Sequence, residues 1–303
     1  MVYTVTLNPA LDYVVRLDAL RAGELNRAKG EEVQPGGKGI NVSCVLGALG
    51  VDSVALGFAA GFTGKALQEL LQGRGIRTDF VWLREGLTRI NVKLKAGQET
   101  EVNGRGPEIS EEALEAFFQK LDGIGQGDVL VLAGSIPGTL PQDMYRRILA
   151  RVEDRGVLTA VDAAGELLCE ALAYRPFLIK PNRAELEEVF GEKLGTDAEI
   201  LACAHRLQER GARNVLVSMA GDGSMLLDET GNVYRLGAPR GCVRNSVGAG
   251  DSMVAGFLAG CLRGEGYAAA HRMGAAAGSA TAFSDGLATR EEIETLFGTF
   301  WNE

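Results

Sequence analysis

The stretch Asn245-Ser246-Val247-Gly248-Ala249-Gly250-Asp251-Ser252 is the most informative segment of this 303-residue chain. Apolar residues follow it at helical spacing, namely Val254, Phe257, Leu258, Cys261 and Leu262. Gly248, Ala249 and Gly250 are therefore expected at a helix N-terminus, where unpartnered N–H groups and the helix dipole favour an anion. Asp251 would repel that anion, but it makes sense there as a base that accepts a proton from an attacking hydroxyl. The alternative is that Asp251 is an ordinary first-turn acid.

A second glycine cluster, Pro35-Gly36-Gly37-Lys38-Gly39-Ile40-Asn41-Val42, also leads into a helical pattern. Its glycines let a ligand touch the backbone, Lys38 offers a cation and Asn41 offers an amide, which together favour a polar sugar or phosphate site. The cluster is not a P-loop, because Lys38 is followed by glycine and not by Ser or Thr. The dinucleotide fingerprint fails as well, because Met253 stands in place of its third glycine, so hydride transfer is disfavoured.

Composition excludes several classes of protein. The chain is 46% hydrophobic and 23% charged, which suffices for one large core. A net charge of −9 argues against nucleic acid or an anionic membrane surface as partner. Five scattered cysteines without a Cys-x-x-Cys pair, no long apolar run and a strand-like N-terminus predict a reduced, cytoplasmic protein with no membrane span.

Short apolar runs alternate with amphipathic helical patterns over most of the chain. The predicted strands are Val2–Leu7, Ser53–Phe58, Val129–Ala133, Leu158–Val161, Phe177–Ile179, Val215–Met219 and Met225–Leu227. Helix starts are predicted at Ser110, near Pro141, and at the capping-box pairs Thr196/Glu199 and Thr289/Glu292. This order predicts a doubly wound α/β domain that spans residues 1–303.

Two regions, residues 13–34 and 88–103, interrupt this order. In the second, Ile90, Val92 and Leu94 alternate with polar residues, which indicates strands with one apolar and one polar face. We expect a small β-sheet lid over the main sheet, with Arg89 and Lys93 on the face that closes on an anion. A pair of solvated surface hairpins is the alternative.

Three further segments carry polar groups at the ends of predicted strands. Asp12 follows the first strand, and the exits of strands are where open α/β sheets bind ligands. Asn182 and Glu185 are three residues apart on one helix face and suit a hydrated Mg²⁺, although taken alone they favour a plain helix start. The stretches 134–138 and 219–224 are by themselves only a loop and a tight turn.

Together these segments resemble the ribokinase-like carbohydrate kinases, the phosphofructokinase-B family. Both glycine signatures occur in the order found in the family, with the lid segments and Lys180-Pro181-Asn182 between them. Lys38, the run Thr88–Lys93 and Gly134-Ser135-Ile136-Pro137 are similar to the branch of 1-phosphofructokinase and tagatose-6-phosphate kinase. The resemblance implies a three-layer domain with a mostly parallel central sheet and a β-sheet lid that forms a homodimer contact.

The resemblance also implies roles for individual residues. Asp251 would be the base, and Gly248, Ala249 and Gly250 would form the anion hole for the transferring phosphoryl group. The implied sugar-binding residues are Asp12, Gly37, Lys38, Asn41, Arg89, Lys93 and Ser135. The implied nucleotide-binding residues are Lys180, Asn182, Glu185, Ser218, Gly221 and Gly223, with Glu185 and Asn182 holding Mg²⁺ through water.

The expected activity is phosphorylation of a ketohexose monophosphate by ATP with Mg²⁺, from fructose 1-phosphate to fructose 1,6-bisphosphate. The alternatives within the same class are tagatose-6-phosphate kinase and 6-phosphofructokinase. An alternative from another class is a non-catalytic sugar-phosphate sensor, which would not need to keep the base. Met219-Ala220 departs from the Leu-Gly usual in the family and affects only the detail of the nucleotide pocket.

Overall fold

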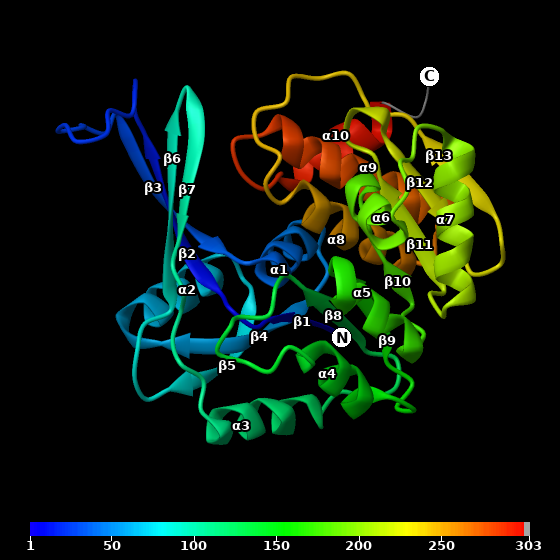
Figure 1. Ribbon diagram of the computed structural model, residues 1–303, viewed down its shortest axis with the longest axis horizontal. Helices are drawn as coiled ribbons and strands as arrows, with labels where there is room; N and C mark the ends of the chain where they lie inside the picture. The colour runs from blue at the N-terminus through cyan, green and yellow to red at the C-terminus, as the bar shows by residue number, and fades with distance from the viewer. Residues whose placement is uncertain (300–303) are drawn as a thin grey trace.

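A computed structural model describes residues 1–299, which form two β-sheets and their covering helices (Figure 1). The large sheet has nine strands in the order β13-β12-β11-β10-β9-β8-β1-β4-β5, all parallel except for the antiparallel pairs β11–β12 and β12–β13. Its strands are β1 Val2–Thr6, β4 Ser53–Ala60, β5 Arg77–Leu83, β8 Val129–Ala133, β9 Leu158–Asp162, β10 Leu178–Ile179, β11 Asn214–Ser218, β12 Ser224–Leu227 and β13 Val233–Leu236.

Helices cover both faces of this sheet, because its central strands are apolar on both sides; all five residues of β8, for example, are buried. One face packs against α3 Glu111–Leu121, α4 Met144–Val152, α5 Gly165–Ala171, α6 Arg183–Phe190 and α7 Asp197–Glu209. The other packs against α1 Lys38–Ala48, α2 Gly61–Gly73, α8 Ala249–Leu262, α9 Tyr267–Phe283 and α10 Arg290–Thr299. Within residues 1–299, no helix has the length and apolar character to cross a membrane.

The predicted α/β fold is confirmed, and the differences lie at the edges of the sheet. Strands β5 and β13 were not predicted, because edge strands with one wet side lack the continuous apolar run of the central strands. The helix predicted to begin near Pro141 is α4, which begins at Met144, and the Pro141 carbonyl accepts a hydrogen bond from the Met144 N–H in the preceding turn. Thr196 and Glu199 form the predicted capping box.

The small sheet has four strands in the order β3-β2-β6-β7 and stands at one side of the large sheet (Figure 1). Its strands are β2 Ala10–Arg16, β3 Gly30–Gly36, β6 Arg89–Ala96 and β7 Gln98–Asn103, with β2 and β6 parallel and both outer pairs antiparallel. The chain enters β2 only three residues after β1 ends. The sequence suggested that Asp12 lies in a loop at the exit of β1. It lies instead inside β2, a strand of the small sheet.

The topology gathers distant parts of the sequence at one edge of the large sheet. Strands β1, β8, β9, β10 and β11 run parallel, so their carboxyl ends meet there. Helices α1 and α8 begin at the same edge, since Lys38, the first residue of α1, and Gly250, the second residue of α8, line a cavity with the ends of these strands. This arrangement places both glycine clusters beside one space.

Candidate active site

A cavity of about 790 Å³ lies between the polar face of the small sheet and the carboxyl ends of the parallel strands. It brings together most of the residues that the sequence singled out. Its lining includes Asp12, Gly37, Lys38, Asn41, Arg89, Lys93, Ser135, Lys180, Asn182, Glu185, Ser218, Gly248, Gly250 and Asp251. Ala249, Gly221 and Gly223 do not line it: Ala249 is the first residue of α8, and the two glycines lie in the turn after β11.

Asp251 occupies the first turn of α8 and is only 5% exposed. The Asn41 amide Nδ2 donates a hydrogen bond of 2.8 Å to its Oδ2 atom. Burial and the nearby charge of Asp162 raise the pKa of Asp251 to about 6, against the smaller opposing effects of Asn41, Lys38 and Lys180. A carboxylate with this pKa is mostly ionised at neutral pH and is a stronger base than an ordinary aspartate, which suits proton abstraction from a hydroxyl.

Asp162, at the end of β9, is an acid that the sequence analysis missed. Its carboxylate is 2% exposed and lies 3.2 Å from the Lys38 Nζ atom and 3.3 Å from the Lys180 Nζ atom. Burial alone would raise the pKa of Asp162, but the two ammonium groups outweigh burial and hold that pKa below its ordinary value. Asp162 follows an apolar parallel strand, so the strand-exit argument applied to Asp12 would have found it.

The glycines at the start of α8 are required by their surroundings. Gly248 adopts a left-handed φ of 81°, and a Cβ there would lie 2.7 Å from the Leu287 side chain. A Cβ on Gly250 would lie 3.0 Å from the Lys180 Nζ atom. Gly248 is therefore required by its φ and by the space beside it, and the missing side chain of Gly250 lets the Lys180 ammonium lie close to the helix start.

The small sheet contributes a row of polar groups to the cavity. Asp12 and Asn91 are direct neighbours in register on β2 and β6, and the Asn91 Nδ2 atom donates a 2.8 Å hydrogen bond to Asp12 Oδ1. Burial raises the pKa of Asp12, and the bond from Asn91 opposes this. Arg89 donates from Nε to the Asn8 carbonyl at 3.0 Å. Lys93 pairs with Glu101 of β7 at 2.6 Å, and this hydrogen bond lowers the pKa of Glu101.

Asn182 and Glu185 form a capping box at the start of α6. Asn182 Oδ1 accepts from the Glu185 N–H at 2.9 Å, and Glu185 Oε2 accepts from the Asn182 N–H at 2.8 Å. The two side chains therefore shape the helix start and also line the cavity. Asn182 also pairs with Ser218 through a parallel β-bridge, which ties the start of α6 to the end of β11.

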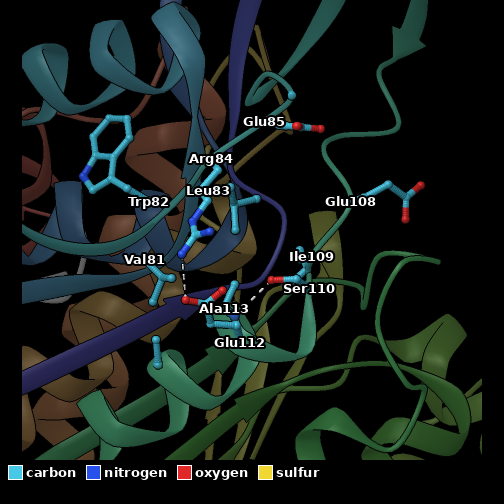
Figure 2. A pocket seen from close by; sticks show the side chains of 12 residues that line it. Val81, Trp82, Leu83, Arg84, Glu85, Glu108, Ile109, Ser110, Glu112 and Ala113 are labelled. Carbon is cyan, nitrogen blue, oxygen red and sulfur yellow. Dashed lines mark hydrogen bonds and ion pairs between the residues drawn. The ribbon is translucent and has the colours of Figure 1, made fainter.

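A second hollow of about 680 Å³ shares no lining residue with this cavity (Figure 2). It lies at the end of the edge strand β5 and the start of α3. Arg84 and Glu112 form an exposed ion pair of 3.0 Å beside it, and Ser110 caps α3 through its side-chain oxygen. Exposed ion pairs contribute little energy, and the Ser110 cap accounts for the polar groups of the helix start, so this hollow shows no arrangement for catalysis.

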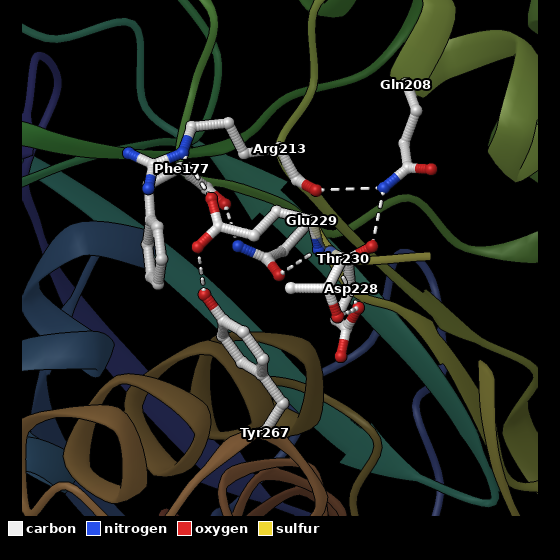
Figure 3. A network of polar contacts seen from close by, with 8 residues as sticks. Phe177, Gln208, Arg213, Asp228, Glu229, Thr230 and Tyr267 are labelled. Carbon is white, nitrogen blue, oxygen red and sulfur yellow. Dashed lines mark hydrogen bonds and ion pairs between the residues drawn. The ribbon is translucent and has the colours of Figure 1, made fainter. Parts of the chain in front are cut away.

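A third group of polar residues ties the antiparallel strands to α9 (Figure 3). Glu229 accepts hydrogen bonds from Arg213 at 2.6 Å and from the Tyr267 hydroxyl at 2.5 Å. Arg213 also lies over the Phe177 ring, 5.3 Å from its centroid. Arg213 and Glu229 are paired with each other, so this network serves the packing beside β11 and β12.

The model of the pfkB family of carbohydrate kinases matches residues 5–294. The chain belongs to this family. It is 46% identical over 296 residues to a 1-phosphofructokinase of Bacillus subtilis, with 98% of this chain and 97% of the relative covered. It is 38% identical over 295 residues to a D-tagatose-1-phosphate kinase of Bacillus licheniformis, with 97% and 96% covered.

Among solved structures, phosphofructokinase-2 of Escherichia coli in complex with substrates and products superposes with a TM-score of 0.93 at 27% identity, and 100% and 99% of the two chains are covered. The same enzyme has been solved as a tetrameric inhibited form. The predicted ribokinase-like fold and kinase class are thereby confirmed. The tagatose relative is named for the 1-phosphate, whereas the sequence alone had suggested a 6-phosphate as the alternative.

The role of base expected for Asp251 makes the pH range of activity depend on the Asn41–Asp251 hydrogen bond. This bond lowers the pKa of Asp251, so its removal in Asn41→Ala raises that pKa above its value of about 6. The base must be deprotonated to act, and activity is lost as pH falls through its pKa. The acid limb of kcat/KM should therefore move upward by roughly one pH unit, the size expected for one hydrogen bond to a charged group.

The measured quantity is the midpoint pH of the acid limb of kcat/KM in the wild type and in Asn41→Ala. A loss of substrate affinity alone would lower the whole profile and leave its midpoint in place. An unchanged midpoint in the folded variant would contradict the assignment of Asn41 as the residue that tunes the base.

Proposed function

We propose that this kinase transfers the γ-phosphoryl group of ATP to the free 6-hydroxyl of fructose 1-phosphate and forms fructose 1,6-bisphosphate. The observation that carries the proposal is that Asp251, the start of α8 and the cationic face of the small sheet border one cavity. The name of the 46% identical relative supports the choice of sugar. Tagatose 1-phosphate is the second candidate, because a relative of 38% identity is named for it.

The residues at the start of α8 have two separate roles in the proposed reaction. Asp251 accepts the proton of the attacking hydroxyl. The backbone N–H groups of Gly248, Ala249 and Gly250 receive the charge of the transferring phosphoryl group. Lys180 lies against Gly250, so its ammonium can neutralise the same charge. The protein thus works by positioning and electrostatics, as expected for phosphoryl transfer.

Arg89 and Lys93 form the clamp for the phosphate that the sugar already carries. Both lie on the polar face of the small sheet and line the cavity. Lys38, which the sequence grouped with them, instead pairs with Asp162 close to Asp251. We therefore assign Lys38 to the reacting end of the cavity, and the small sheet acts as a lid that supplies the clamp.

The residues fit a nucleotide with Mg²⁺ at the other end of the cavity. Lys180, Asn182, Glu185 and Ser218 line this end, and the turn with Gly221 and Gly223 continues from it. Glu185 uses Oε2 in its capping box, so Oε1 and the Asn182 amide can hold water molecules of a hydrated Mg²⁺. When bound, the ion would neutralise nucleotide phosphate charge. All five cysteines are free, which supports a cytoplasmic location.

The sugar specificity can be tested by measuring kcat/KM for fructose 1-phosphate, tagatose 1-phosphate, tagatose 6-phosphate and free fructose. We expect the highest value for fructose 1-phosphate. Each charge-assisted contact to the phosphate contributes roughly 1.5–3 kcal/mol, so free fructose should be worse by a factor of at least about 100. A higher kcat/KM for tagatose 1-phosphate would change the proposed substrate but leave the proposed kinase activity intact. A higher kcat/KM for free fructose, together with an Arg89→Ala variant of unchanged activity, would contradict the role of Arg89 and Lys93 in binding the phosphate.

We also propose that the small sheet pairs two copies of the chain into a homodimer. On the face away from the cavity, Val33, Tyr13, Val92 and Val102 are aligned in register across all four strands. Val33 is 45% exposed and Val102 is 59% exposed, so an apolar band faces outward. A second copy of the same face would cover this band. Assembly also occurs in the related phosphofructokinase-2.

Light scattering at micromolar concentration tests the dimer. The wild-type protein should be a dimer, and Val102→Glu should be a monomer because it places a charge in the apolar band. Val233→Glu is the matched control, since Val233 is 43% exposed on the edge strand β13 of the large sheet. A fully active wild-type monomer would contradict the proposal.

A further inference from the structure

Asn91 is a buried polar side chain with an unused acceptor. It is 6% exposed, and its Oδ1 atom has no hydrogen-bond partner within residues 1–299. A buried carbonyl without a partner is costly, and such groups in folded proteins call for an explanation. Asn91 lines the cavity that contains Asp251, so a bound molecule could supply the missing donor.

The orientation of the Asn91 amide is fixed by its neighbour. A carboxylate accepts hydrogen bonds, so the NH₂ group must face Asp12, and the carbonyl is left for a ligand. Asp12 is itself held in place, because it is bonded to Asn91 on one side and packs against Gly36 on the other. A Cβ on Gly36 would lie only 2.5 Å from Asp12 Oδ1.

Asn91 and Asp12 both line the cavity on the side of the small sheet, and between them they hold two acceptor groups, the Asn91 carbonyl and the Asp12 carboxylate. Neighbouring ring hydroxyls of a ketohexose are hydrogen-bond donors, which such a pair of acceptors can bind. Asn41, which the sequence also grouped with the sugar, is bonded to Asp251 and so belongs to the reacting end. Asp12 and Asn91 are therefore better placed than Asn41 to bind the hydroxyls of the sugar ring.

We propose that Asn91 is a specificity-determining residue whose carbonyl accepts a hydrogen bond from a ring hydroxyl while its amide fixes Asp12 for the neighbouring hydroxyl. This inference rests on the proposed function. Fructose and tagatose phosphates differ only in the configuration at C4. The wrong epimer would leave one of the two buried acceptors unpaired, and a site that loses a hydrogen bond in this way discriminates strongly.

The test compares kcat/KM for fructose 1-phosphate and tagatose 1-phosphate in the wild-type enzyme and in Asn91→Ala. We expect the variant to lose about 10- to 100-fold with the preferred sugar and much less with its epimer, so that the selectivity ratio falls toward one. KM for ATP should stay within about twofold of the wild-type value, since Asn91 lies in the lid and not at the nucleotide end.

Asn103→Ala is the matched control. Asn103 is the direct cross-strand neighbour of Asn91 on β7 and belongs to the same row, but it is exposed and does not line the cavity. This variant should keep both the rate and the selectivity. If Asn91→Ala proves unstable in thermal unfolding, Asn91→Leu replaces it, because leucine is of similar size and lacks the same polar groups. The same fall in the selectivity ratio is then expected for Asn91→Leu.

The outcomes separate this inference from the proposed function. If the wild-type enzyme phosphorylates neither sugar phosphate, the proposed function falls and the inference falls with it. If the wild type is active and Asn91→Ala lowers both rates equally, with an unchanged ratio, Asn91 only supports the lid and the inference is overturned. A wild type that does not distinguish the two sugars overturns it as well.

Discussion

Two lysine ammonium groups converge on one buried carboxylate, and the chemistry of the cavity depends on this arrangement. Asp162 is 2% exposed, so its charge is stable only because Lys38 and Lys180 lie within 3.3 Å of it. In turn, Asp162 keeps Lys180 beside the first turn of α8 and contributes to the raised pKa of Asp251. In the proposed reaction, the same charges prepare both the base and the place that receives the phosphoryl group.

This arrangement is possible only in a parallel sheet of this order. Asp162 ends β9, Lys180 follows β10, Lys38 begins α1 and Asp251 lies in the first turn of α8. These residues come from four separate parts of the chain. Parallel pairing sets the strand ends side by side, and the glycines before each helix let the backbones approach. The small sheet then borders the cavity with Asp12, Arg89, Asn91 and Lys93.

The sequence predicted the central sheet well, because its strands are continuous apolar runs such as Val129–Ala133. It also located both glycine clusters, which are local signals. It failed where the outcome depends on neighbours distant in the chain. The position of Asp162 at a strand exit could be read from the sequence, but its pairing with Lys38 and Lys180 could not. The spacing of Asn182 and Glu185, which also suited a metal, is explained by their capping box.

Asn91 shows the same limit inside the small sheet. Alternation placed it on the polar face with Arg89 and Lys93, but nothing in the sequence indicates that it pairs with Asp12, 79 positions away. That contact follows from the parallel register of β2 and β6. Strand register between distant segments is set by the whole fold, so it is the part of the site that local patterns leave open.

The most direct test of this account is the turnover of Asp251→Ala, measured together with equilibrium binding of fructose 1-phosphate. The account assigns Asp251 to proton transfer and the sugar contacts to other residues. It therefore predicts that kcat falls by roughly 10²–10⁴-fold, the range for a lost general base, while the sugar phosphate still binds. Near-normal turnover in the folded variant would contradict it.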